Sequence, residues 1–211
     1  MTHYADALQA WSSGDLEQAA VLCRRLLADQ PNHAQALNLL AGVQYRRGEM
    51  AEAIISLQRL VALQPNDALV IMNLGNLHRA QNRLDEALVA YERALLLQPQ
   101  LADAHYNRAI VLKATGRLDE AQRAYEMTLQ LVSDYLPARL NLANLLVETN
   151  RPAAAVEHYK VVLTRDPTNA AVIELLGHAN FLAGRFADAV TTFRSLPAGT
   201  IISALVCHRV G

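Results

Sequence analysis

Hydrophobic residues recur along the chain at intervals of three and four, which places their side chains on one face of a helix. Leu37, Leu40 and Ala41 form one such run, and Ala53 and Leu57 belong to the next. Short polar segments with Gly, Asn or Pro separate the runs, and these residues favour turns and helix ends. The pattern predicts an all-α protein whose helices are each about a dozen residues long.

The pattern repeats every 34 residues, as Asn73 with Asn107 and Tyr91 with Tyr125 illustrate. Two positions of the repeat hold only small residues. The first position holds Ala19, Ala53, Ala87, Ala121, Ala155 and Ala189, and the second holds Ala7, Ala41, Gly75, Ala109, Ala143 and Gly177. Helices cross closely only where side chains are this small, so we expect stacked helix pairs.

A period of 34 residues with Leu-Gly, a later Ala, an aromatic residue and a closing Pro resembles the tetratricopeptide repeat (TPR). The resemblance implies a right-handed solenoid of antiparallel helix pairs. We expect about six repeats in one solenoid domain, residues 1–197, followed by a C-terminal helix. The expected repeats are residues 1–33, 34–67, 68–101, 102–135, 136–169 and 170–197.

The last segment, residues 198–211, contains Ile201, Ile202, Leu205 and Val206 but few charged residues. Solenoids normally end in a helix with a polar outer face. This apolar helix is therefore a cap that folds back on repeat six, the start of a truncated repeat in a longer protein, or a contact with another copy that makes a homo-oligomer.

The composition excludes several functional classes. The 211 residues are 52% hydrophobic and 18% charged, with a net charge of −1, which removes the electrostatic attraction that nucleic-acid binding needs. The sequence contains no apolar run of about 20 residues, as a membrane span requires. The amino terminus does not resemble a secretory signal. We therefore expect a cytoplasmic protein that binds neither membranes nor nucleic acids.

The sequence contains no motif that indicates catalysis. It has no phosphate-binding glycine loop, no His-Glu-x-x-His zinc helix and no nucleophile elbow. The histidines do not recur at metal-ligand spacing, and Cys23 is expected to lie in the core, at a position that is Leu or aromatic elsewhere. Cys207 and His208 are adjacent and cannot form a dyad on a helix. We expect a non-enzymatic protein without cofactor or metal.

The recurring asparagines are the main candidates for function. In the TPR family the first helix of each repeat lines the concave wall. Asn73, Asn107 and Asn141 share one position on these helices, and Asn76 and Asn144 share another one turn later. An asparagine amide can both donate to and accept from a peptide backbone. The arrangement resembles the asparagine ladder in the superhelical TPR arm of O-linked N-acetylglucosamine transferases, which grips extended polypeptide by its backbone.

Other side chains are expected to add selectivity in this groove. Tyr45 and Tyr106 should face it as aromatic anchors, as should Tyr4 and Trp11. Arg79 and Lys113 should lie near its edge. Another TPR class clamps the carboxylate terminus of chaperone tails with basic residues, but Met72, Tyr106 and Leu140 occupy a position where that clamp needs a base. Chaperone-tail binding is therefore disfavoured.

The prediction is a scaffold or protein-binding module that holds an extended peptide segment of a partner in its concave groove. One alternative is a scaffold that self-assembles through its terminal helix. Another is the substrate-recruiting arm of a larger enzyme such as a glycosyltransferase. A structural alternative exists for the asparagines themselves, which could hydrogen-bond from one repeat to the next and bind no ligand.

Overall fold

The computed structural model describes residues 2–197, which form twelve α-helices and no β-strand. The first helices of the successive pairs are α1 (Thr2–Ser12), α3 (Ala34–Arg46), α5 (Ala68–Ala80), α7 (Ala102–Ala114), α9 (Leu136–Glu148) and α11 (Ala170–Leu182). The second helices are α2 (Leu16–Asp29), α4 (Met50–Leu63), α6 (Leu84–Leu97), α8 (Leu118–Leu131), α10 (Pro152–Arg165) and α12 (Phe186–Arg194). The predicted all-α fold class is confirmed. The division of the sequence into six repeats stays a prediction.

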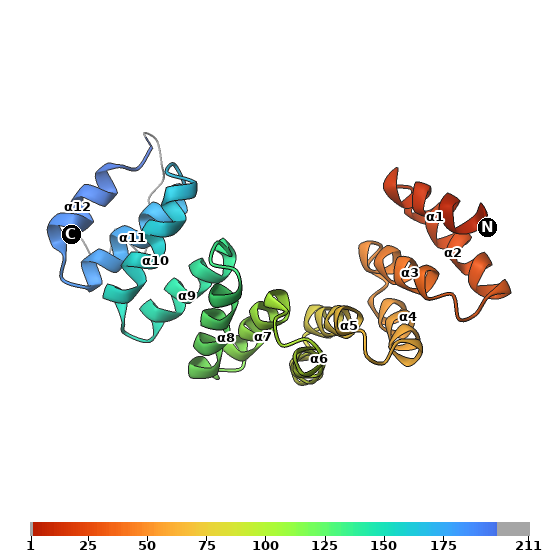
Figure 1. Ribbon diagram of the computed structural model, residues 1–211. Coiled ribbons are helices and arrows are strands. Elements are labelled where there is room, and N and C mark those ends of the chain that lie inside the picture. The colour runs from red at the N-terminus through yellow and green to blue at the C-terminus, as the bar shows by residue number, and fades with distance from the viewer. Residues whose placement is uncertain (1, 198–211) are drawn as a thin grey trace. The chain divides into compact units, whose positions relative to one another are not determined.

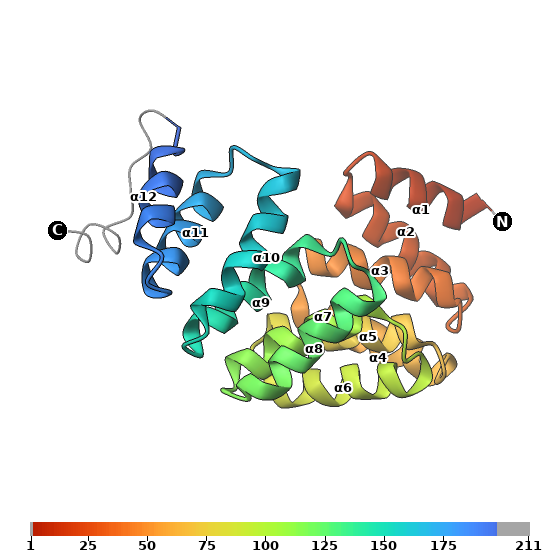
Figure 2. The same cartoon turned by 60° about the vertical axis from the view of Figure 1, so that its left-hand side comes forward.

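The helices form two compact units, one ending at Arg117 and the other beginning at Leu118. The boundary therefore falls in the turn between α7 and α8. Within the first unit each helix from α1 to α7 packs on the next along the chain, and α8 to α12 do the same in the second unit (Figures 1 and 2). Both units are consequently stacks stabilised by contacts between near neighbours in the sequence.

The turn inside each helix pair is set by one residue in the left-handed conformation. The residues are Gly14, Gly48, Asn82, Gly116, Asn150 and Gly184, with φ between 58° and 83°. Glycine has no Cβ to clash at positive φ, and asparagine tolerates this region better than other residues. This requirement explains why only Gly or Asn occupies the position.

The small residues identified in the sequence lie in the core. All six alanines of the first small position are at most 3% exposed, and all six residues of the second are buried. Large side chains of the second helices pack beside them, including the fully buried rings of Tyr91 and Tyr159. The predicted close crossing of paired helices is therefore present.

Arginine side chains join neighbouring repeats in the first unit. Arg59 Nη2 donates to the carbonyl of Pro31 at 2.8 Å, and Arg93 Nη2 donates to the carbonyl of Pro65 at 2.6 Å. In both bonds the two residues are separated by 28 positions. The proline that ends one repeat thus supplies an acceptor for the second helix of the next.

Two single residues depart from the pattern of the other repeats. Cys23 is fully buried, as expected for a core residue. Arg108 replaces a leucine of other repeats, and its guanidinium pairs with Glu92 on α6 at 3.4 Å. The apolar segment 198–211, with Cys207 and His208, lies outside the described residues.

Candidate functional site

A cavity of about 590 Å³ opens on the first unit between α1, α3 and α5. Its lining comes almost entirely from first helices. The residues are Tyr4, Leu8, Trp11, Asn38, Leu39, Ala41, Gly42, Tyr45, Leu57, Asn73, Asn76, Leu77, Arg79 and Ala80. The volume lies within the range of roughly 300–1,000 Å³ that is typical of ligand pockets. We call this feature the α1–α3–α5 cavity.

Aromatic side chains form one wall of the cavity and are held in place by their neighbours. The guanidinium carbon of Arg46 lies 4.9 Å from the centre of the Trp11 ring, a cation–π arrangement. The Tyr4 ring lies 5.4 Å from that of His33, whose Nδ1 in turn accepts from the backbone N–H of Ala36 at the start of α3. Two aromatic side chains of α1 are therefore positioned by residues at the two ends of α3.

Gly42 gives the cavity its depth. A β-carbon at this position would lie 3.6 Å from Cη2 of Trp11, an ordinary van der Waals distance. The corresponding residues one, two and three repeats later are Asn76, Ile110 and Asn144, all with larger side chains. The missing side chain in the second repeat leaves the space beside the indole open.

Asn73 and Asn107 carry amides that make no hydrogen bond to any residue between 2 and 197. Both side chains are half-buried, and Asn73 lines the α1–α3–α5 cavity. Asn141, on α9 in the second unit, is also half-buried but interacts with another part of the chain. The three equivalent asparagines therefore do not share one environment.

Asn76 and Asn144 have a structural partner. The hydroxyl of Tyr91 donates to Asn76 Oδ1 at 2.8 Å, and the hydroxyl of Tyr159 donates to Asn144 Oδ1 at 2.7 Å. Each bond joins the two helices of one pair, whereas the structural alternative stated above had bonds between successive repeats. Asn76 is also one of the lining residues of the α1–α3–α5 cavity.

Burial changes the acidity of these two tyrosines. It raises the pKa of Tyr91 to about 12, although the neighbouring Arg79 guanidinium acts in the opposite direction. Burial also raises the pKa of Tyr159, and the Glu148 carboxylate adds to the effect. Both hydroxyls therefore keep their protons at neutral pH and remain donors to the asparagines.

The structure brings together only part of the predicted site. Tyr45, Asn73, Asn76 and Arg79 line one cavity, together with Tyr4 and Trp11. Tyr106, Asn107 and Lys113 lie on α7 outside that lining, and Asn141 and Asn144 belong to the second unit. Tyr106 and Lys113 are half-buried and interact with other residues of the chain. Their predicted role in peptide binding stays a prediction.

Sequence reasoning missed several lining residues. They are Leu8, Asn38, Leu39, Ala41, Gly42, Leu57, Leu77 and Ala80. A signal existed for Gly42, because a glycine stands where the other repeats have Leu, Asn, Ile or His on the outward side of the first helix. No comparable signal marks Leu39 or Leu77, whose apolar side chains fit the core pattern equally well.

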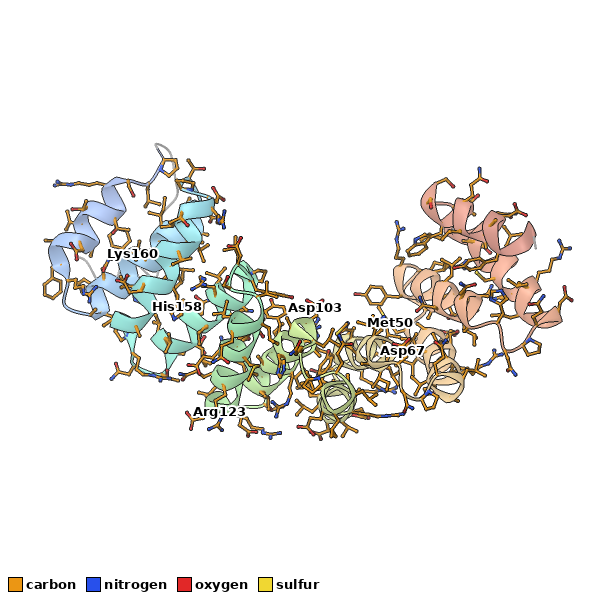
Figure 3. All side chains as sticks on the ribbon, in the orientation of Figure 1. Met50, Asp67, Asp103, Arg123, His158 and Lys160 are labelled. Atoms are coloured by element: carbon orange, nitrogen blue, oxygen red, sulfur yellow. The ribbon has the colours of Figure 1, made fainter. Side chains whose placement is uncertain are left out.

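Outside the cavity, few groups among the described residues are suited to metal binding or nucleophilic chemistry. No three His, Cys, Asp or Glu residues among positions 2–197 are grouped so that they could hold a metal ion. Burial raises the pKa of the Cys23 thiol to about 11, which opposes formation of a nucleophilic thiolate. On α10, His158 is half-buried and Lys160 is exposed (Figure 3). None of the described helices is long and apolar enough to cross a membrane.

Sequence models of one repeat family match nearly the whole chain. Models described as "Tetratricopeptide repeat" match residues 10–75, 100–168 and 140–200, and one described as "TPR repeat" matches residues 75–116. No protein with a curated description matches the sequence.

Solved structures with a similar fold come from several proteins. The crystal structure of MamA is 25% identical, with a TM-score of 0.72 over 78% of this chain and 96% of that one. PilF of Pseudomonas aeruginosa is 23% identical, with a TM-score of 0.77 over 90% of this chain and 86% of that one. YrrB, whose structure is described as "a TPR protein with an unusual peptide-binding site", is 17% identical. It has a TM-score of 0.70 over 82% of this chain and 89% of its own.

Proposed function

Because the chain belongs to the tetratricopeptide repeat family and has its all-α solenoid fold, we propose that it binds an extended peptide segment of a partner protein along the first helices of its repeats. In this role it acts as a non-enzymatic interaction module. The α1–α3–α5 cavity is the part of that surface where the peptide is held most closely.

One observation carries this proposal. The amide of Asn73 lies at the wall of an aromatic cavity and makes no hydrogen bond to any described residue. Because the fold leaves this half-buried amide unbonded, its donors and acceptor are available to pair with the backbone groups of a ligand in place of water. Asn107 repeats the same side chain on α7, also without a partner among residues 2–197.

The chemistry of asparagine suits a peptide backbone. Its amide offers two donors and an acceptor, which matches the N–H and C=O of any residue regardless of side chain. Neighbouring packed helices lie roughly 8–10 Å apart, and an extended chain advances about 3.3 Å per residue. Asn73 and Asn107 would therefore meet backbone groups about three residues apart, as in the asparagine ladder of the glycosyltransferase arm.

One similar structure supports this class of function. The structure of YrrB is described as having a peptide-binding site, and its fold is shared by this chain. For Asn141, at the repeat position of Asn73 but in a different environment, we also propose contact with a peptide backbone. For Asn144 we propose bracing through its bond to Tyr159. A cytoplasmic location is part of the proposal.

The experiment begins with random 12-residue peptides displayed on phage and selected against the full chain. The affinity of an enriched peptide is then measured by calorimetry for Asn73→Ala, Asn107→Ala and the double variant. Each lost hydrogen bond should weaken binding by about 1 kcal/mol, or roughly fivefold in Kd. Helical content should not change, because neither amide has a partner within the described chain.

Asn32→Ala is the matched control. Asn32 is exposed in the turn between α2 and α3, away from the cavity lining, so its replacement should leave the affinity unchanged. If the double variant binds every enriched peptide as tightly as the unmodified chain, the asparagines do not grip a peptide and the proposal fails.

A further inference from the structure

We infer that the α1–α3–α5 cavity selects a peptide with a bulky apolar side chain next to an acidic one. The inference rests on the proposed peptide-binding function and names the class of peptide. Its argument has two parts, the shape of the space beside Trp11 and the charge around it.

The shape favours one large apolar side chain. Gly42 leaves open the space next to the Trp11 indole, and Leu8, Leu39 and Tyr45 line the same cavity. Binding an apolar side chain against aromatic and aliphatic walls lowers the free energy, because it removes that side chain from water. Binding anchors generally fill pockets of this kind, where flanking contacts exclude solvent. A Phe, Trp, Leu or Met of the peptide is the expected occupant.

The charge favours an acidic neighbour. Within the part of the chain that the structure describes, Arg79 is the one charged residue of the lining, and the guanidinium of Arg46 covers the Trp11 ring at 4.9 Å. No Asp or Glu among residues 2–197 lines the cavity. Among the described residues neither arginine forms an ion pair, and Arg79 Nε is buried without a hydrogen-bond partner. Two guanidinium groups beside one cavity attract a carboxylate of the ligand.

The adjacent Arg47 differs from Arg46 because its charge is paired with carboxylates of the same chain. Arg47 Nε pairs with Glu49 at 2.8 Å, and its guanidinium also binds Glu17 on α2. Arg46 is next in sequence but faces Trp11 without such a partner among the described residues. Arg47 therefore stabilises the contact between two repeats, whereas the charge of Arg46 is available to a ligand.

The protein's own C-terminal segment does not suit the cavity. Residues 198–211 contain Arg209 and no Asp or Glu, so their charge has the same sign as that of Arg46 and Arg79. Like charges in contact reduce affinity. The favoured occupant is therefore an acidic segment of another protein.

Peptides selected from the same 12-residue phage library provide the test. Enriched sequences should carry Phe, Trp, Leu or Met within two residues of Asp or Glu. Gly42→Leu fills the cavity and should raise the Kd of such a peptide by about tenfold or more. Gly42→Ala adds only a β-carbon, which fits beside Trp11, so its effect on Kd should be smaller than that of Gly42→Leu. Asn32→Ala, outside the lining, is the control that should leave Kd unchanged.

Two further variants cover the case in which Gly42→Leu disturbs the fold. Tyr45→Ala removes a side chain that is 48% exposed, so it should lower the affinity for the peptide without affecting the core. Arg46→Glu should raise the Kd of the acidic peptide by about fivefold. It should lower the Kd of the same peptide with its acidic residue replaced by Lys. Circular dichroism verifies that each variant is folded.

The results separate failure of this inference from failure of the proposed function. If Asn73→Ala lowers the affinity for the enriched peptides but Gly42→Leu and Tyr45→Ala do not, the proposed peptide binding stands. The cavity then does not select for a bulky apolar side chain. Enrichment of basic sequences overturns the inference as well. So does tight binding of a synthetic 198–211 peptide that Gly42→Leu abolishes. If no peptide is enriched at all, the proposed function itself fails.

Discussion

Gly75 faces the ring of Tyr91 so closely that a β-carbon on the glycine would lie 2.8 Å from Cε1 of the tyrosine. The ring is fully buried and its hydroxyl is bonded to Asn76, so it cannot move aside freely. The same relation joins Gly177 to Phe193, at 2.5 Å. In these two pairs the absence of a methyl group sets how closely the first and second helices approach.

The first prediction is that Gly75→Ala destabilises the protein by about 1–3 kcal/mol, the usual cost of overpacking a core. The intrinsic preference of alanine for helices would otherwise stabilise α5 by up to about 1 kcal/mol. Urea denaturation followed by circular dichroism measures the free energy of unfolding.

Gly42→Ala is the control for this measurement. Gly42 is also inside a first helix, but its β-carbon would meet Trp11 at the ordinary distance of 3.6 Å. This variant should therefore match or exceed the unmodified chain in stability. Equal losses in the two variants would show that the Tyr91 ring does not limit the approach of the helices.

The second prediction concerns the hydrogen bond between Tyr91 and Asn76. Tyr91→Phe keeps the ring but removes the donor to Asn76 Oδ1, and it should cost about 1 kcal/mol of stability. In a double-mutant cycle with Asn76→Ala, the two losses should be less than additive, because both substitutions remove the same bond.

Tyr159→Phe provides a parallel measurement in the second unit, where Tyr159 donates to Asn144. A similar loss there would confirm that the bond braces a helix pair in both units. Strict additivity in the Tyr91–Asn76 cycle would contradict the bracing role and return Asn76 to the ligand-binding candidates.

The third prediction concerns His78, which is buried on α5 and whose Nδ1 has no partner among the described residues. Burial lowers the pKa of this imidazole, while Glu86 raises it and Arg83 lowers it. The unfolded chain therefore takes up the proton first. The contribution of His78 to stability is fully present above its pKa in the unfolded chain, about 6.5. It declines as the pH falls through the lower pKa of the folded state.

His78→Leu tests this effect, since Leu112 and Leu146 occupy the corresponding buried position in later repeats. The variant should gain about 1 kcal/mol at neutral pH, because an unsatisfied buried group is removed. It should also lose less stability between about pH 7.5 and about pH 5 in urea titrations. His158 also has a pKa lowered by burial, so some acid sensitivity should remain. An unchanged pH profile would contradict the prediction.

The fourth prediction is that the Cys23 thiol is unreactive in the folded protein. Burial raises its pKa to about 11, so the thiolate forms less readily than in the unfolded chain. Stability from this group is present below the unfolded pKa and is lost as the pH rises through the folded value. In a Cys207→Ser background, an aromatic disulfide reagent should label the chain only as fast as it unfolds. Rapid labelling under native conditions would contradict burial.

Much of the fold could be predicted from the sequence because the same physical requirement recurs at the same position. Asn82 and Asn150 alternate with glycines where the turn needs positive φ, and the small residues mark where helices cross. Each requirement is local, so a single sequence shows it several times. The boundary between two compact units after Arg117 depends on contacts between helices and leaves no local signal.

The candidate site was predictable in part. Asn73, Tyr45 and Arg79 were found because their outward positions follow from the helical period, and they do line one cavity. The bond from Tyr91 to Asn76 was not found, since tyrosine at that position is explained equally well as a core ring. The cavity depends on the missing side chain at Gly42 and on the Trp11 ring beside it, which belongs to another helix, so no local stretch of sequence indicates it.

The bonds from Arg59 to the Pro31 carbonyl and from Arg93 to the Pro65 carbonyl also bear on how such a chain can evolve. Both span the same number of residues, so copying or deleting a whole repeat carries the donor and the acceptor together. Inserting one residue between a donor and its acceptor changes the spacing of that bond. Gene segments of one full period are therefore the natural unit of lengthening, and the surface that each new unit presents can diverge afterwards without disturbing the joint.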